Sequence, residues 1–181
     1  MALGDLHKRP SYCSKVANNL VVKKRRPINK KEAKRIRQGL LNTHNMEFSI
    51  KAGEYELAKA DDFDVIIQNG HIFALVVDDV THLSVRGLLS IIPQTGWVQV
   101  DMGAVPYVCN GANVMSAGIN GASSEVVEGQ YVWIREESQH KPLAVGKSLL
   151  SSQEMLNSDK GKAIKALHYI GDKVWNYGVK D

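Results

Sequence analysis

The run VDMGAVPYVCNGANVMSAGI, residues 100–119, is dense in glycine and other small residues. It predicts a helix of about two turns from Ala104 to Asn110, ended by Gly111 in a left-handed conformation. Gly103 and Ala104 at the start of that helix leave the backbone amides uncrowded, as the approach of a phosphate requires. The same small residues also suit tight turns and close packing in a small barrel. From the residues alone, both interpretations stay open.

Short apolar segments surround this run and alternate with glycine-containing turns. Ser151 and Glu154 have the spacing of a capping box, which predicts one further helical turn. Many short strands of this kind are typical of a compact β-barrel, here with one inserted helix. Strands are predicted at 97–101, 131–134, 143–147 and 166–175.

An amphipathic helix is predicted in the first half of the chain. Asn29 is its N-cap and Glu32, three residues on, completes a capping box. Ala33, Ile36 and Leu40 form one apolar stripe, which is most simply explained by core packing. The other faces are basic and form the functional candidate of this helix, at Lys30, Lys31, Lys34, Arg35 and Arg37.

Beyond this helix the apolar period changes to two, which is typical of strands. Asn69-Gly70 between two apolar runs is a strong hairpin signal, because a type I′ turn needs positive φ at both central positions. Residues 81–92 are predicted to form a short helix with Thr81 as its cap. Strands are predicted at 46–51, 54–57, 65–68 and 71–77.

These elements predict an α+β fold in two domains. An antiparallel sheet covered by the basic helix occupies residues 28–95, and the barrel occupies 96–181. The boundary falls at the turn-forming Gln94-Thr95-Gly96. Residues 1–27 mix polar, basic and small residues without a period and are expected to form a basic N-terminal arm.

Charge is unevenly distributed along the chain. Residues 1–37 carry 12 basic and two acidic residues, whereas the remaining 144 carry 11 basic and 17 acidic residues. The first balance is +10 and the second is −6, within a net charge of +4. Such asymmetry favours an acidic partner for the N-terminal part, most commonly nucleic acid. The alternative is a solvated basic surface without a partner.

Several classes of protein are excluded by composition. Cys13 and Cys109 are too few for a disulfide scaffold and lack a zinc-binding spacing. No run approaches the roughly 18 apolar residues of a spanning helix, and the first residues lack the apolar segment of a secretory signal. The six histidines show neither metal-ligand spacing nor a neighbouring nucleophile. We therefore expect a cytoplasmic protein without catalytic residues, metal or cofactor.

The run at 100–119 resembles the signature of the PUA domain, a small RNA-binding barrel named for pseudouridine synthases and archaeosine transglycosylases. The family pattern is Asp-x-Gly-Ala, then Gly-Ala-x-Val-Met, then Gly-Ile or Gly-Val. Ala117 stands where a proline is usual, and the resemblance extends over residues 96–177. The chain matches the pattern at Asp101, Gly103, Ala104, Gly111, Ala112, Val114, Met115, Gly118 and Ile119.

The C-terminal residues narrow this resemblance. SQEM at 152–155 and KGKAIKALHYIGDKVW at 160–175 are similar to the ending of T-cell-amplified-sequence-type proteins and their small archaeal relatives. Those proteins are partners of density-regulated protein in translation reinitiation and ribosome recycling. They carry an α/β pre-PUA domain before the barrel, which the resemblance places at residues 28–95.

The resemblance also implies an RNA-binding surface along the inserted helix and its adjoining strands. Tyr107 either stacks on a base or covers the barrel. Lys147 is the favoured phosphate contact because it follows Gly146 on a strand with accessible backbone. Arg135 is a second candidate, but it equally fits a solvated charge. The implied surface comprises Gly103, Ala104, Tyr107, Asn110, Gly111, Asn113 and Met115.

We therefore expect a non-catalytic protein that binds tRNA or rRNA in translation initiation or recycling. The small ribosomal subunit or a translation factor is a further expected partner, and a membrane is not. One alternative is an RNA-specificity or adaptor subunit of an RNA-modification or ribosome-biogenesis complex. The other is an enzyme in its own right, for which the chain shows no acid–base constellation.

Overall fold

The computed structural model describes residues 20–61 and 63–179, which divide into two compact units. Residues 20–93 and 173–179 belong to the first unit, and residues 94–172 belong to the second. The division between the units falls near residue 94, and the C-terminal segment 173–179 lies with the first unit and not with the barrel. Residues 1–19, most of the predicted arm, lie outside the described residues.

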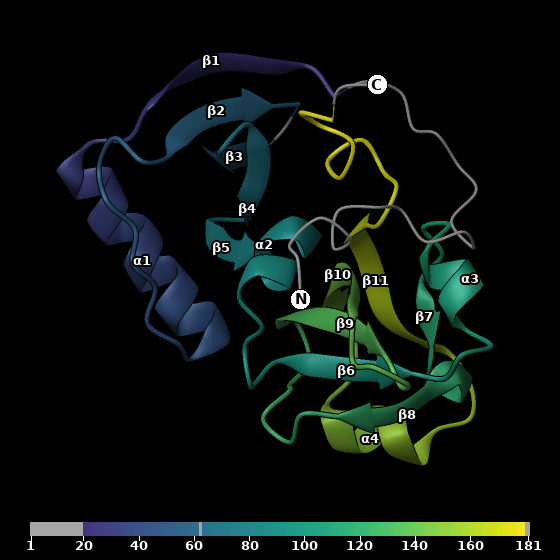
Figure 1. Ribbon diagram of the computed structural model, residues 1–181. Helices are drawn as coiled ribbons and strands as arrows, with labels where there is room; N and C mark the ends of the chain where they lie inside the picture. The colour runs from purple at the N-terminus through teal and green to yellow at the C-terminus, as the bar shows by residue number, and fades with distance from the viewer. Residues whose placement is uncertain (1–19, 62, 180–181) are drawn as a thin grey trace. The chain divides into compact units, whose positions relative to one another are not determined.

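The first unit contains a five-stranded antiparallel sheet in the order β1-β2-β3-β4-β5. Two helices accompany it, α1 (Lys30–His44) and α2 (Val85–Ser90). Figure 1 shows α1 lying along one side of this sheet. The strands are β1 (Val22–Pro27), β2 (Glu56–Ala60), β3 (Phe63–Gln68), β4 (His71–Val77) and β5 (Val80–Leu83).

The capping box of α1 and the hairpin between β3 and β4 are confirmed. The Asn29 side chain accepts a hydrogen bond from the Glu32 amide at 2.9 Å, and the Glu32 carboxylate accepts one from the Asn29 amide at 2.9 Å. Asn69 and Gly70 have φ values of 51° and 82°, as a type I′ turn requires. The predicted stripe of α1 is buried at Ala33, Ile36 and Leu40.

Three local predictions in this unit were wrong. Residues 22–27 form the edge strand β1 and not part of an arm, because they pair with β2, where Arg25 is bound to Glu56. The predicted strand 46–51 is absent, although Phe48 and Ile50 are buried. The alternation of apolar and polar residues in this segment therefore reflects burial without strand pairing. The cap of α2 is Ser84, which accepts from the Gly87 amide, because Thr81 is already paired in β5.

The C-terminal segment 173–179 completes the core of the first unit. Val174 is buried in the same cluster as Ala58, Val65 and Ile72. A Cβ on Gly178 would lie 2.1 Å from the Gly70 carbonyl oxygen, so this close approach requires glycine. The predicted strand through Trp175 is therefore wrong, because the chain leaves β11 (Lys162–Tyr169) and turns into the first unit.

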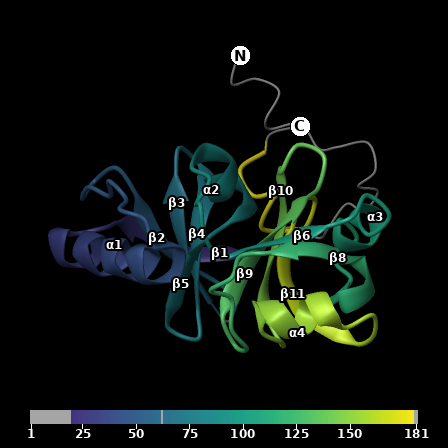
Figure 2. The same cartoon turned by 90° about the horizontal axis from the view of Figure 1, so that it is seen from below.

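The second unit is a six-stranded sheet that curls into a half-barrel in the order β7-β11-β10-β9-β6-β8. Figure 2 shows this curl, with α3 and α4 at its periphery. α3 is shorter than predicted, and the Ser151–Glu154 capping box opens α4 as predicted. Its elements besides β11 are β6 (Trp97–Val100), α3 (Val105–Val108), β7 (Val114–Met115), the 3₁₀ turn Ser116–Gly118, β8 (Ile119–Ala122), β9 (Tyr131–Glu136), β10 (Pro142–Ser148) and α4 (Ser152–Asn157). Among the described helices, none combines the length and apolar character needed to cross a bilayer.

Candidate functional site

A groove of about 360 Å³ lies between α3 and β7 in the second unit. Five of the residues implied by the resemblance line it together: Gly103, Ala104, Tyr107, Asn113 and Met115. The other residues that line it are Asp101, Val108, Val114, Ala117 and Gly118.

The groove combines a buried apolar floor with exposed apolar walls. Val108 and Val114 are 3% and 2% exposed and belong to the core. Tyr107 is 69% exposed and Met115 is 46% exposed, although both are large apolar side chains. Burying a large exposed aromatic ring against a flat partner releases water from apolar surface. The groove is therefore a platform on which a planar group can stack.

The Asp-x-Gly-Ala motif builds the wall opposite β7. Asp101 Oδ1 accepts a hydrogen bond from the Ala104 amide at 2.8 Å, which holds the turn that precedes α3. A Cβ on Gly118 would lie 2.9 Å from the Ala104 Cβ, so the small residues serve close packing. The expectation of open amides at the start of this helix was wrong at Ala104, because the Asp101 carboxylate already binds that amide.

Gly111 and the two asparagines have contacts within the fold. Gly111 has a φ of 81°, and a Cβ there would lie 2.5 Å from the Tyr169 ring. Asn110 Nδ2 donates to the Pro106 carbonyl at 2.8 Å, and Asn113 Oδ1 accepts from the Ala166 amide at 3.0 Å. Of these three, only Asn113 lines the groove.

The Arg135 side chain contacts two residues of β6. Its guanidinium carbon lies 3.6 Å from the centroid of the Trp97 ring, and its Nε donates to Gln99 Oε1 at 3.1 Å. Burial lowers the pKa of this guanidinium. Arg135 is therefore partly buried and stacked on Trp97, and its phosphate contact stays a prediction.

Lys147 lies on a cationic row that crosses β10 and β11. It is directly opposite Lys165 in the ladder, and its Nζ lies 5.6 Å from the centroid of the Tyr131 ring. The stated reason for favouring Lys147 was wrong, because Gly146 is buried and not accessible. A Cβ on Gly146 would lie 2.5 Å from Ile164 Cγ2.

The sequence reasoning missed Lys162, which lies beside the groove. Lys162 is exposed and directly opposite Met115 in the β11–β7 ladder. Residues in register share a face of the sheet, so this ammonium group stands next to the apolar wall. The lysines at 162 and 165 are visible in the sequence. Only the register of β11 with β7 shows that Lys162 lies beside the groove.

The basic residues of the first unit fall into two groups. On β1 and its neighbours, Arg25 is bound to Glu56 and Arg26 is bound to Glu32, so these charges are neutralised inside the unit. The predicted basic face of α1 is exposed and makes no salt bridge to any described residue. It consists of Lys30, Lys31, Lys34, Arg35 and Arg37.

The buried histidines have structural partners. His168 Nδ1 lies 2.8 Å from Asp172 Oδ2, and the Leu83 amide donates to His44 Nε2 at 3.0 Å. Within residues 20–61 and 63–179, no group of three or more His, Cys, Asp and Glu side chains could hold a metal ion.

The curled sheet, the inserted α3 and the groove define a PUA domain, and the PUA domain family model matches residues 96–170. The chain is 31% identical over 131 residues to the malignant T-cell-amplified sequence 1 homolog of Drosophila melanogaster, covering 69% of this chain and 72% of that protein. It is 34% identical over 89 residues to translation machinery-associated protein 20 of Saccharomyces cerevisiae, covering 46% and 49%. The crystal structure of hypothetical protein PH0734.1 from Pyrococcus horikoshii matches with a TM-score of 0.74 and 30% identity, over 86% of this chain and 99% of that chain. The chain therefore belongs to the family of PUA-domain proteins that includes malignant T-cell-amplified sequence 1 and translation machinery-associated protein 20.

Proposed function

We propose that this protein binds structured RNA, tRNA or ribosomal RNA, during translation initiation or recycling, and that it does so in the cytoplasm without catalysing a reaction. The observation that carries the proposal is the exposed Tyr107 ring at the groove of a PUA domain, beside Met115 and Lys162. The names of its relatives, which refer to the translation machinery, support the process.

The groove and the lysine row supply the two kinds of contact that RNA binding needs. A base that stacks on an aromatic side chain contributes roughly 1–3 kcal/mol. Lys147 and Lys165 lie directly opposite each other, and like charges in that position are mutually unfavourable. Two ammonium groups on neighbouring strands can contact one backbone phosphate through charge-assisted hydrogen bonds. The PUA domain therefore holds a base at Tyr107 and backbone phosphates along β10 and β11.

The proposed role in translation also implies protein partners. The small ribosomal subunit or a translation factor would bring the bound RNA into its working position. The alternative, an adaptor for an RNA-modification or ribosome-biogenesis complex, would be favoured by an exposed apolar patch on the first sheet. In the described part of the first unit, the exposed large apolar side chains are Val21, Ile92 and Val179, none of them on a strand.

Crosslinking in cells followed by sequencing of the bound RNA tests the proposal. Cells express the tagged full chain, or the chain with Tyr107→Ala, and Val127→Ala serves as a control because Val127 is also exposed and apolar. We expect tRNA or rRNA reads from the wild type and the control, and a strong loss with Tyr107→Ala. Recovery of a single protein partner without enriched RNA would favour the adaptor and contradict the proposal.

A further inference from the structure

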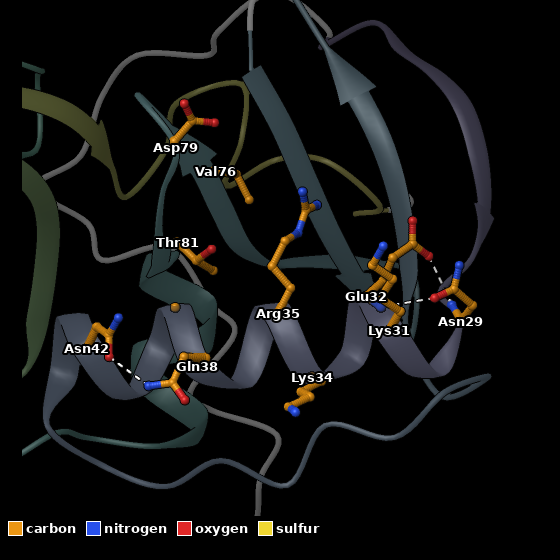
Figure 3. Close-up of a pocket in the computed structure, with 11 residues that line it drawn as sticks. Asn29, Lys31, Glu32, Lys34, Arg35, Gln38, Asn42, Val76, Asp79 and Thr81 are labelled. Atoms are coloured by element: carbon orange, nitrogen blue, oxygen red, sulfur yellow. Dashed lines mark hydrogen bonds between the residues drawn. The ribbon is translucent and has the colours of Figure 1, made fainter.

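A second and larger groove lies in the first unit, between α1 and the hairpin of β4 and β5. It encloses about 800 Å³, within the range of small-molecule sites. Gly39 allows α1 to approach β5 closely, because a Cβ there would lie 2.7 Å from Thr81 Oγ1. Figure 3 shows the helix as one wall and Val76, Asp79 and Thr81 on the other. The helical wall consists of Asn29, Lys31, Glu32, Lys34, Arg35, Gln38, Gly39 and Asn42.

The electrostatics of this groove favour an anion. Glu32 is bound to Arg26 and to the Asn29 amide, and these contacts lower the pKa of its carboxyl to about 2. Its charge is therefore matched mainly by Arg26, with a smaller contribution from Arg35. Asp79 is the other carboxylate in the lining, against three cationic side chains on α1. Figure 3 shows Arg35 extending from the helix across the hollow toward Val76.

An amide pair lies beside these cations. Gln38 Nε2 donates to Asn42 Oδ1 at 2.8 Å, which fixes these side chains about one and two turns beyond Arg35. The pair still offers Gln38 Oε1 as an acceptor and the Asn42 amino group as a donor. A nucleobase edge carries both donors and acceptors, so each of these two groups can hydrogen-bond to one.

We propose that this groove binds one unpaired nucleotide of the RNA, with its phosphate at Lys31 and Arg35 and the edge of its base at Gln38 and Asn42. The inference rests on the proposed function, because it assumes that the chain binds RNA at all. It places a second RNA contact in the first unit, separate from the groove at Tyr107.

Binding of the full chain to a fluorescein-labelled single-stranded RNA of about ten nucleotides tests this site. Lys31→Ala and Arg35→Ala should weaken binding and each lower the salt slope by about 0.7, the value for one phosphate of a single strand. Gln38→Leu should weaken binding roughly fivefold or more without changing the salt slope, because it removes a base contact but no charge. Lys51→Ala, an exposed lysine of the same unit outside the groove, should behave as the wild type.

The outcomes separate this site from the proposed function. Unchanged affinity with Gln38→Leu, or displacement of the RNA by polyglutamate as effectively as by unlabelled RNA, would overturn the nucleotide site. If the groove variants bind as the wild type while Tyr107→Ala binds weakly, the site is wrong and the proposed function stands. If the wild type binds neither this RNA nor tRNA, both are wrong. Thermal unfolding confirms that each variant is folded, as these exposed positions lead us to expect.

Discussion

The guanidinium of Arg86 lies over the ring of Trp175, 4.2 Å from its centroid, and its Nε donates to the Trp175 carbonyl at 2.9 Å. The two residues are 89 positions apart, and they are only 4% and 2% exposed. A buried guanidinium needs such partners, because an unpaired charge in the interior is strongly unfavourable. The C-terminal segment is therefore part of the first unit.

Trp175→Ala should destabilise the first unit by about 3–5 kcal/mol, since it removes a buried ring and exposes the charge of Arg86. Hydrogen exchange measured on individual peptides reports the stability of each unit separately. Protection should fall in β2–β5 and remain in β9–β11. Val179→Ala, at a half-exposed position of the same segment, is the control and should change little. Equal loss of protection in both units would contradict this assignment.

Stability of the first unit should decrease in acid because of His44. Burial lowers the pKa of His44 from 6.5 to about 4, and its Nε2 accepts the Leu83 amide, so the folded unit favours the neutral ring. The unfolded chain binds the proton first, so this contribution is complete above pH 6.5 and is lost as the pH falls toward 4. The loss at pH 5 should be about 2 kcal/mol.

Urea unfolding of the wild type and of His44→Gln, at pH 7 and pH 5, measures this contribution. Glutamine keeps an acceptor for the Leu83 amide but does not titrate, and the remaining histidines are common to both proteins. The difference in stability between the two pH values should therefore be smaller in the variant. The same pH dependence in both proteins would show that His44 is not responsible.

Gly111→Ala should destabilise the second unit more than Gly129→Ala. Both glycines have a φ of 81°, so both substitutions carry the cost of a left-handed residue, roughly 1–2 kcal/mol. A Cβ at Gly111 also meets the Tyr169 ring at 2.5 Å, whereas a Cβ at Gly129 meets nothing within 4 Å. Thermal unfolding of the two variants compares them directly. Equal losses would mean that Tyr169 moves away without cost.

Lys162→Ala should lower the salt slope of tRNA binding by about one phosphate contact, because Lys162 stands beside the groove opposite Met115. The matched control is Lys141→Ala, which removes an exposed lysine from the turn before β10. Its salt slope should equal that of the wild type. If both variants lower the slope equally, the lysines contribute only general charge.

Local signals in the sequence predicted local structure well. Asn29 with Glu32, Ser151 with Glu154, and Asn69-Gly70 each specify a cap or turn through contacts between neighbouring residues, and all three are present. Val174 and Trp175 were predicted to end the last strand of the barrel, but they are buried in the first unit, because apolarity alone does not say which core a residue joins. β1 was missed because its charged residues become a strand only through pairing with β2.

The candidate site was likewise predicted where it depends on local sequence and missed where it depends on packing. The motif resemblance led to Tyr107 and Met115 because glycine and alanine spacing fixes the turns around them. Lys162 was missed, and the contacts of Arg135 with Trp97 and Gln99 were not foreseen, because both depend on which strands become neighbours. The lining of the groove on α1 also depends on how the helix packs against β5, which its basic face alone did not indicate.

The most direct test of RNA binding at the PUA groove is a fluorescence anisotropy titration of labelled tRNA with the full chain, compared with Tyr107→Ala. Tyr107→Phe is the control because it keeps the ring. Wild type and Tyr107→Phe should bind similarly, with affinity that falls steeply between about 50 and 200 mM KCl. Tyr107→Ala should bind about 5- to 150-fold more weakly, as the loss of one stacked base predicts. Equal affinity of the wild type and Tyr107→Ala for tRNA would contradict the account.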